Sequence, residues 1–134
     1  MRMHYTFPTL DFGTAGEIYY VMGPKGRKGK LVDYGVHHPT ETFTATTLPA
    51  YVSVGTAADA DAYGEELSMG TLAADAGSLS VRTSTRDPAV IDTYILDAGL
   101  KMPADTKVGL HCTAPTGGTP AGFANPFMII DWED

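Results

Sequence analysis

Two stretches, Lys107-Val-Gly-Leu-His-Cys-Thr113 and Phe127-Met-Ile-Ile-Asp-Trp132, decide the fold class of this chain. Both are short, apolar and composed mainly of residues that favour strands, and residues 115–122 between them form a glycine-rich loop. Many short extended runs separated by Gly, Pro and Asp precede them. A closing strand after such a series is typical of a β-sandwich or barrel. We therefore predict an all-β fold: a mainly antiparallel, jelly-roll-like β-sandwich in a single domain.

The segments upstream supply the other strands of this sandwich. Strands are expected at residues 17–22, 31–37, 41–47, 51–54, 66–72 and 79–85. With strands of about 5–6 residues, the whole fold should contain about seven to ten of them. Residues 88–98 are ambiguous, because their apolar side chains fit one face of a helix and also a short strand at residues 93–96. We favour the strand.

Residues 1–15 show no sustained apolar period and contain Pro8 and Gly13. We predict that they form an extended N-terminal arm and that residues 16–134 form the sandwich. Ordering such an arm costs about 1–2 kcal/mol per residue, and burying its large side chains returns only about 1.5–3 kcal/mol each. The arm should therefore be held by main-chain pairing with a neighbour, either another copy or a partner protein; the alternative is packing on its own domain. Its four large apolar side chains are Tyr5, Phe7, Leu10 and Phe12.

Composition and charge bound the possible functions. A chain of 134 residues with 43% hydrophobic residues is long enough and apolar enough for one folded domain. Only 19% of the residues are charged, which is low for a soluble protein. The net charge of −7 argues against nucleic-acid binding, because phosphate contacts need a basic surface.

One local segment departs from this acidic character. Four of the nine basic residues, Lys25, Arg27, Lys28 and Lys30, fall within six positions and alternate with glycines. One interpretation is a solvated loop tip. The other is an electrostatic contact with an acidic partner surface, which would steer the encounter of the two proteins.

The start of the chain carries no apolar core of signal-peptide length, and no run of eighteen apolar residues occurs. We therefore expect synthesis in the cytoplasm, without signal-peptide secretion or a membrane span. Cys112 is the single cysteine, which excludes an intrachain disulfide and a C-x-x-C metal site. Because its neighbours alternate as in a strand, we expect a buried and inert thiol.

Residues 59–66 form an acidic loop that partly matches a calcium site. Asp59 and Asp61 stand at positions 1 and 3 of an EF-hand pattern, but Gly70 stands where the bidentate glutamate belongs. The glutamates of this loop offer oxygen ligands for some other geometry. The favoured interpretation is a solvated loop in which the carboxylates cap turns.

Other catalytic or metal-binding patterns are equally incomplete. His37 and His38 are adjacent, so on a strand they point to opposite faces and need His4 or His111 to complete a metal site. No G-x-S-x-G motif occurs, and the Gly-Gly pair at residues 117–118 does not precede a helix. We predict no catalytic residue, no metal and no cofactor, and a protein that is not an enzyme.

Five segments give the chain a recognisable layout. They are Gly29-Lys-Leu-Val-Asp-Tyr-Gly35, Tyr51-Val-Ser-Val-Gly55, Met102-Pro-Ala-Asp-Thr-Lys-Val-Gly-Leu-His-Cys112, Thr116-Gly-Gly-Thr-Pro-Ala-Gly122 and Met128-Ile-Ile-Asp-Trp132. Across roughly residues 16–132, their order resembles the small capsid cement, or head decoration, proteins of tailed bacteriophages.

The resemblance implies a structural virion protein on the outer capsid surface. Such proteins often form trimers at local threefold points and clamp neighbouring subunits of the major capsid protein. It implies the major capsid protein and self-association, as a homotrimer, as partners, with neither nucleic acid nor membrane. The residues expected to contact the partner are those of the arm and the basic loop: Tyr5, Phe7, Leu10, Phe12, Lys25, Arg27 and Lys28.

Two other classes of protein stay open. A carbohydrate-binding sandwich would stack sugars on an exposed Tyr19, Tyr51 or Trp132, although the chain offers a single Trp and a single Asn for that purpose. A small enzyme on a β-scaffold is the second alternative.

Overall fold

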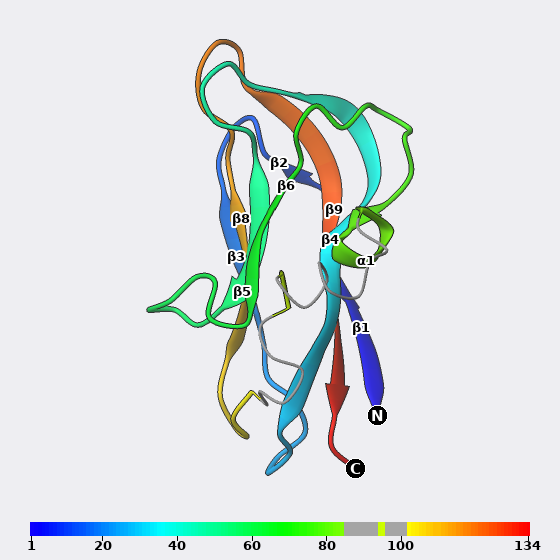
Figure 1. Ribbon diagram of the computed structural model, residues 1–134, viewed down its shortest axis with the longest axis vertical. Helices are drawn as coiled ribbons and strands as arrows, with labels where there is room; N and C mark the ends of the chain where they lie inside the picture. Colours follow the sequence, from blue (N-terminus) through cyan, green and yellow to red (C-terminus); the bar gives the residue numbers. More distant parts are fainter. Residues whose placement is uncertain (85–93, 96–101) are drawn as a thin grey trace.

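Two antiparallel β-sheets packed face to face make up the protein (Figure 1). The structure is a computed structural model that describes residues 1–84, 94–95 and 102–134. Its elements are β1 (Arg2–Thr6), β2 (Leu10–Asp11), β3 (Glu17–Val21), β4 (Gly29–Thr44), β5 (Tyr51–Gly55), β6 (Gly64–Ser68), β7 (Leu79–Ser80), α1 (Val81–Ser84), β8 (Val108–Thr113) and β9 (Ala121–Trp132). The predicted all-β antiparallel sandwich is confirmed, with nine strands among the described residues.

The order of the strands decides which edges are open. In the first sheet the order is β1-β9-β4-β7, with β2 also on β9, and in the second it is β3-β8-β5-β6. Across the core, β8 contacts β9 and β4 contacts β5. The edge strands β1 and β3 therefore lie on the same side of the sandwich. There the rings of Phe7 and Tyr19 stack with their centres 4.5 Å apart and join the two edges.

Alternation along the strands builds the core, since successive side chains of a strand point to opposite faces. In β9 the inward positions are fully buried apolar residues such as Met128 and Ile130, and in β4 they include Tyr34 and Val36. The second sheet contributes Val52, Val54, Val108, Leu110 and Cys112 to the same cluster.

Strand β4 joins two segments that the sequence pattern separates. Residues 31–37 and 41–47 were expected as two strands, but Gly29–Thr44 runs as one strand along β9. The pairing register shifts between His37 and Glu41, and His38 has a φ of 52°. A bulge of this kind lets Pro39 stay in the strand, because proline cannot supply a ladder hydrogen bond.

The expectation of a separate N-terminal arm is corrected by the pairing of β1 and β2. All five residues of β1 pair with β9, from Arg2 opposite Asp131 to Thr6 opposite Phe127, and β2 pairs with the start of β9. Residues 1–15 are thus part of the first sheet of their own chain. The sequence shows no sustained apolar period in this segment because Pro8 separates its two short strands.

The predicted strand at residues 79–85 is wrong for residues 81–84, where the chain forms the helical turn α1, and residue 85 lies outside the described residues. The carboxylate of Asp33 accepts hydrogen bonds from Ser80 Oγ at 2.8 Å and from Arg82 N at 3.2 Å, and Ser80 N donates to Thr83 Oγ1 at 2.7 Å. Such side-chain bonds compete with a strand ladder.

Two further predictions concern nearby segments. The strand expected at residues 66–72 is instead β6, which ends at Ser68. Of residues 88–98, only Tyr94 and Ile95 are described, and Ile95 forms an isolated antiparallel bridge with Gly64. The choice between helix and strand for the rest lies outside the described residues.

Asp33 should contribute strongly to stability. It is 7% exposed and accepts hydrogen bonds from Tyr34 N, Ser80 Oγ and Arg82 N. We expect Asp33→Ala to lower the free energy of unfolding by about 2–3 kcal/mol, because buried donors lose a charged acceptor. Asp33→Asn keeps one acceptor oxygen and should lose about half as much. Urea denaturation measures both, and an Asp33→Ala protein as stable as the wild type would contradict the expectation.

Candidate binding surface

The exposed apolar side chains gather on one side of the sandwich. Among the described residues six large apolar side chains are exposed: Met1, Met3, Ile18, Tyr20, Met22 and Leu48. All but Leu48 lie on or directly beside the edge strands β1 and β3. Clusters of this kind on a folded surface mark contact sites for other molecules.

Strand β3 carries the most continuous part of this apolar surface. Ile18, Tyr20 and Met22 are 41%, 40% and 52% exposed. A Cβ placed on Gly109 of the neighbouring strand β8 would meet Tyr20 Cε1 at 3.0 Å and Ile18 Cγ2 at 3.3 Å. The two side chains therefore lie over this glycine on the outer face of the second sheet.

The main-chain edge of β3 is also open. Its five residues pair in register with β8, and no other described strand pairs with it. It contains neither proline, lysine nor a bulge, devices that keep an edge strand from pairing with other chains, but it does carry the charged Glu17, whose Oε1 accepts a hydrogen bond from Ile18 N at 3.1 Å. The other edge on this side, β1, carries Arg2 and His4. Each of the two edges thus carries a charged side chain, and β3 adds the exposed apolar pair Ile18 and Tyr20.

The predicted basic loop follows directly after β3. Lys25, Arg27 and Lys28 are exposed in the connection from β3 to β4, beside both chain termini at the lower end of the molecule in Figure 1. The loop backbone is fixed, because Gly26 N donates to Asp105 Oδ1 at 2.8 Å and Lys28 N donates to Glu133 Oε1 at 3.2 Å. None of the three cationic groups forms an ion pair with the described residues.

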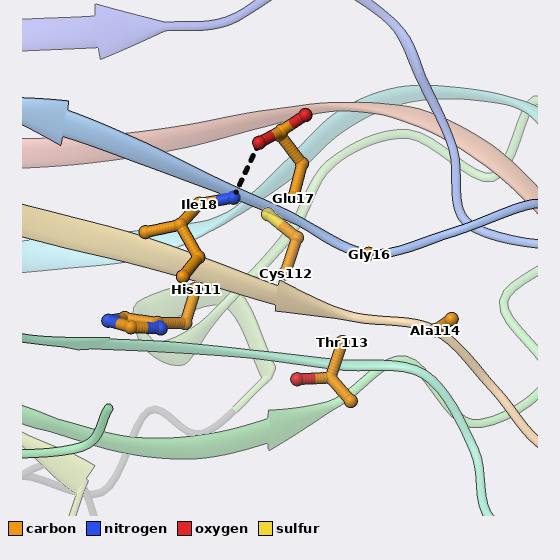
Figure 2. A pocket seen from close by; sticks show the side chains of 7 residues that line it. All are labelled: Gly16, Glu17, Ile18, His111, Cys112, Thr113 and Ala114. Carbon is orange, nitrogen blue, oxygen red and sulfur yellow. Dashed lines mark hydrogen bonds between the residues drawn. The ribbon is translucent and has the colours of Figure 1, made fainter. Parts of the chain in front are cut away.

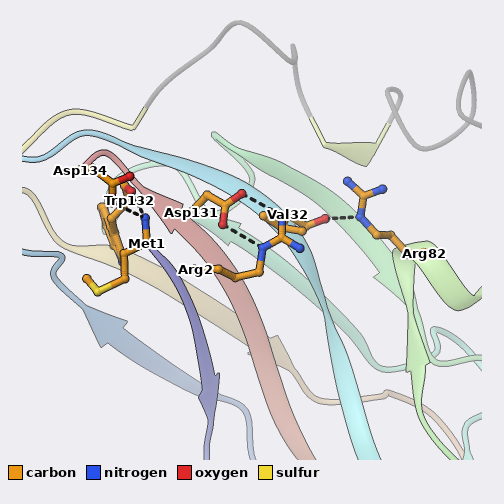
Figure 3. A network of polar contacts seen from close by, with 7 residues as sticks. All are labelled: Met1, Arg2, Val32, Arg82, Asp131, Trp132 and Asp134. Carbon is orange, nitrogen blue, oxygen red and sulfur yellow. Dashed lines mark hydrogen bonds and ion pairs between the residues drawn. The ribbon is translucent and has the colours of Figure 1, made fainter.

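Two other arginines are engaged within the chain, as Figure 3 shows. Arg2 donates from Nε and a second guanidinium nitrogen to the carboxylate of Asp131 at 2.8 and 2.9 Å, and this bond lowers the pKa of Asp131. Arg82 Nε donates to the carbonyl oxygen of Val32 at 2.6 Å. The cations of the basic loop differ from these two arginines, because they are exposed to solvent.

We call Ile18, Tyr20, Met22, Lys25, Arg27 and Lys28 together the docking strip. Lys107 Nζ lies beside this strip, 5.7 Å from the centre of the Tyr20 ring.

The four aromatic and apolar residues predicted as partner contacts in the arm are used inside the domain. The hydroxyl of Tyr5 accepts a hydrogen bond from Trp132 Nε1 at 2.9 Å, Phe7 stacks on Tyr19, and Leu10 packs against the core. Phe12 is fully buried. All four residues thus have contacts within their own domain, and Phe12 has no surface left for a partner.

The candidate stacking platforms for a sugar are also placed by the structure. Trp132 is 3% exposed, and one face of the half-buried Tyr19 ring is covered by Phe7. Tyr51 lies on β5 and lines a surface pocket.

A shallow open pocket of about 550 Å³ lies at the junction of β3 and β8 (Figure 2). His111 Nε2 lies 2.9 Å from the carbonyl oxygen of Thr56, and Glu17 Oε1 accepts a hydrogen bond from Ile18 N at 3.1 Å. Burial raises the pKa of Cys112 to about 12, so its thiol stays protonated at neutral pH. The potential base and nucleophile of this pocket are thus held in structural roles.

The histidines and the acidic loop have local partners. His37 Nδ1 lies 2.6 Å from Ser78 Oγ, and its ring stacks on Phe127 with centres 3.8 Å apart. Burial, with His4 nearby, lowers the pKa of His37. In the acidic loop, Asp61 N donates to Asp59 Oδ1 at 3.4 Å, a turn-capping contact.

In the part of the chain that the structure describes, no group of three or more His, Cys, Asp or Glu is placed to hold a metal ion. No described helix is both long and apolar enough to cross a membrane.

Sequence reasoning found the basic loop but missed the apolar half of the docking strip. The missed signal was the composition of residues 18–22, in which the side chains on both faces of the strand are apolar. A strand with one solvent-facing side normally alternates apolar with polar residues. Apolar residues on both faces of an edge strand therefore mark the outer face as a candidate contact surface.

Comparison with known proteins does not add a family to this picture. No family model, no curated protein and no solved structure matches the chain.

Proposed function

We propose that this protein is a structural virion protein that binds the outer capsid surface and stabilises the lattice of the major capsid protein. The resemblance of the segment layout to capsid cement proteins supplies the class of partner. The observation that carries the proposal is the docking strip, an open apolar edge strand followed directly by a basic loop whose cations form no ion pair with the described residues.

The apolar half of the strip provides affinity. Burying Ile18, Tyr20 and Met22 against a partner stabilises the complex by up to about 1.5–3 kcal/mol for each side chain, before the costs of association. The open edge of β3 also lets an extended capsid segment add as a further strand, with main-chain hydrogen bonds. A segment with apolar side chains on alternate positions fits this surface.

The basic half of the strip provides orientation. The chain as a whole carries a net charge of −7, whereas the basic loop at one end gathers four of its nine cationic side chains, beside the carboxylates of Asp105 and Glu133 that bind its backbone. An acidic surface on the capsid would attract this end and repel the others. Homotrimers at local threefold points would present three strips at once and raise the overall affinity through multivalency.

The direct test is binding to capsid shells. Purified protein is added to expanded shells assembled from the major capsid protein of the same genome, and the bound copies are counted after sedimentation. We expect saturable binding that stabilises the shells against heat or denaturant. Shells that sediment without the protein at every concentration would refute the proposal.

The basic loop gives a charge-specific prediction. Changing Lys25, Arg27 and Lys28 together to Gln should weaken shell binding about 10-fold or more at low salt, and the difference should shrink as salt is raised. The matched control adds the same charge difference elsewhere, as Glu at the exposed positions Thr40, Ala76 and Thr119. Equal loss of binding in both variants would show that only net charge matters and would contradict a role for the loop.

A further inference from the structure

A second surface site lies on the outer face of the same sheet, away from the docking strip. It is a pocket of about 250 Å³ lined by Leu48, Pro49, Tyr51, Glu66 and Ser68. Tyr51 of β5 is directly opposite Ser68 of β6, and Glu66 lies two residues before Ser68 on the same strand. Since side chains two positions apart share a face, all three belong to one face of the sheet.

One wall of this pocket is held rigidly. Leu48 is 57% exposed, yet its backbone forms two hydrogen bonds with Thr116, N to O at 3.2 Å and O to N at 2.9 Å. Pro49 follows it with a fixed φ angle. An exposed leucine on a fixed backbone costs little entropy when a ligand covers it, so the apolar wall is preorganised for binding.

The polar groups of the pocket are available to a ligand. The Glu66 carboxylate and the Tyr51 hydroxyl form no hydrogen bond or ion pair with the described residues. Ser68 Oγ accepts a hydrogen bond from Gly70 N at 3.1 Å, which leaves its own proton free to donate. An apolar concave surface with a few convergent polar groups is the usual composition of a small-molecule site.

We infer that this pocket binds a neutral pyranose sugar. The C–H face of a sugar ring stacks on one aromatic ring and an apolar wall, which Tyr51, Leu48 and Pro49 provide. The carboxylate of Glu66 accepts hydrogen bonds from two neighbouring hydroxyl groups, and such bonds to a charged acceptor are the stronger kind. The Ser68 hydroxyl donates to a third oxygen. The site is independent of the docking strip and of the capsid proposal.

Two other ligand classes fit this pocket less well. A quaternary ammonium group is usually held by a cage of several aromatic rings, whereas a single aromatic residue lines this site. A proline-rich peptide needs an extended groove lined by aromatic side chains. The small volume and the single aromatic platform favour a monosaccharide unit.

Saturation-transfer NMR with a panel of methyl glycosides (glucose, galactose, mannose and N-acetylglucosamine) tests the inference. At least one glycoside should receive saturation from the protein, with a Kd of about 1 mM or weaker, as is common for single small-ligand contacts. Tyr51→Ala should weaken this binding about 10-fold or more, whereas Tyr51→Phe keeps the platform and should weaken it less. Tyr20→Ala is the matched control, an exposed tyrosine on the same face outside the pocket.

Glu66→Gln distinguishes binding of a neutral sugar from binding of a cation. A glutamine still hydrogen-bonds to hydroxyl groups, so sugar binding should fall by only several-fold and stay insensitive to salt. Tetramethylammonium is run in parallel; binding of this ion that exceeds sugar binding, and that vanishes in Glu66→Gln and in high salt, would overturn the inference. Circular dichroism confirms that each variant is folded. Absence of glycoside saturation in the wild type, or equal loss in Tyr51→Ala and Tyr20→Ala, would also overturn it.

Discussion

Replacing Phe12 by alanine is expected to lower the free energy of unfolding by about 3–5 kcal/mol, because a fully buried aromatic side chain leaves a cavity that the core cannot close. The Phe12 ring meets Phe43 edge to face at 5.2 Å between centres, so the substitution also removes an aromatic pair. For a domain of this size, the melting temperature should fall by about 10–20 °C. Differential scanning calorimetry measures both quantities.

The matched control is Met3→Ala, which truncates a side chain of the same segment that is 36% exposed. This variant should lose less than about 1 kcal/mol. Removal of residues 2–12 should destabilise the domain even more than Phe12→Ala, since the first sheet also loses the pairing of β1 and β2 with β9. A truncated protein that melts at the wild-type temperature would restore the hypothesis of a free arm.

Placing aspartate at both Ile18 and Tyr20 is expected to weaken binding to capsid shells by about 100-fold or more, because two exposed anchors are lost and charges are introduced into an apolar contact. Both side chains lie on the outer face of β3, so the domain itself should keep its fold and its melting temperature within a few degrees. Sedimentation with shells over a range of protein concentrations gives the apparent affinity.

Leu48→Asp is the control for this double variant. It places one aspartate, against two in the double variant, on an apolar residue that is 57% exposed and is not part of the docking strip. We expect shell binding close to that of the wild type. If Leu48→Asp weakens binding as strongly as the change at Ile18 and Tyr20, general surface hydrophobicity explains the interaction and the edge of β3 has no special role.

The sequence by itself determined the fold class and most of the strand positions. The alternating residues 107–113 correspond to β8 and the apolar run 127–132 to the second half of β9, and residues 17–22 and 51–54 correspond to β3 and β5. Such predictions succeed because a period of two depends only on neighbours in the chain. The buried state of Cys112 follows from the same pattern and is confirmed.

Only the tertiary structure decided the roles of residues 1–15 and of the outer face of β3. The pairing of β1 with β9 joins residues separated by nearly the whole chain, so no local pattern shows it. Whether Ile18 and Tyr20 are core or surface depends on the position of β3 at the edge of its sheet. The turn at α1 likewise depends on the Asp33 carboxylate, which reaches Ser80 from a distant strand. Local sequence sets which residues alternate, and long-range pairing sets which of the alternating faces meets solvent.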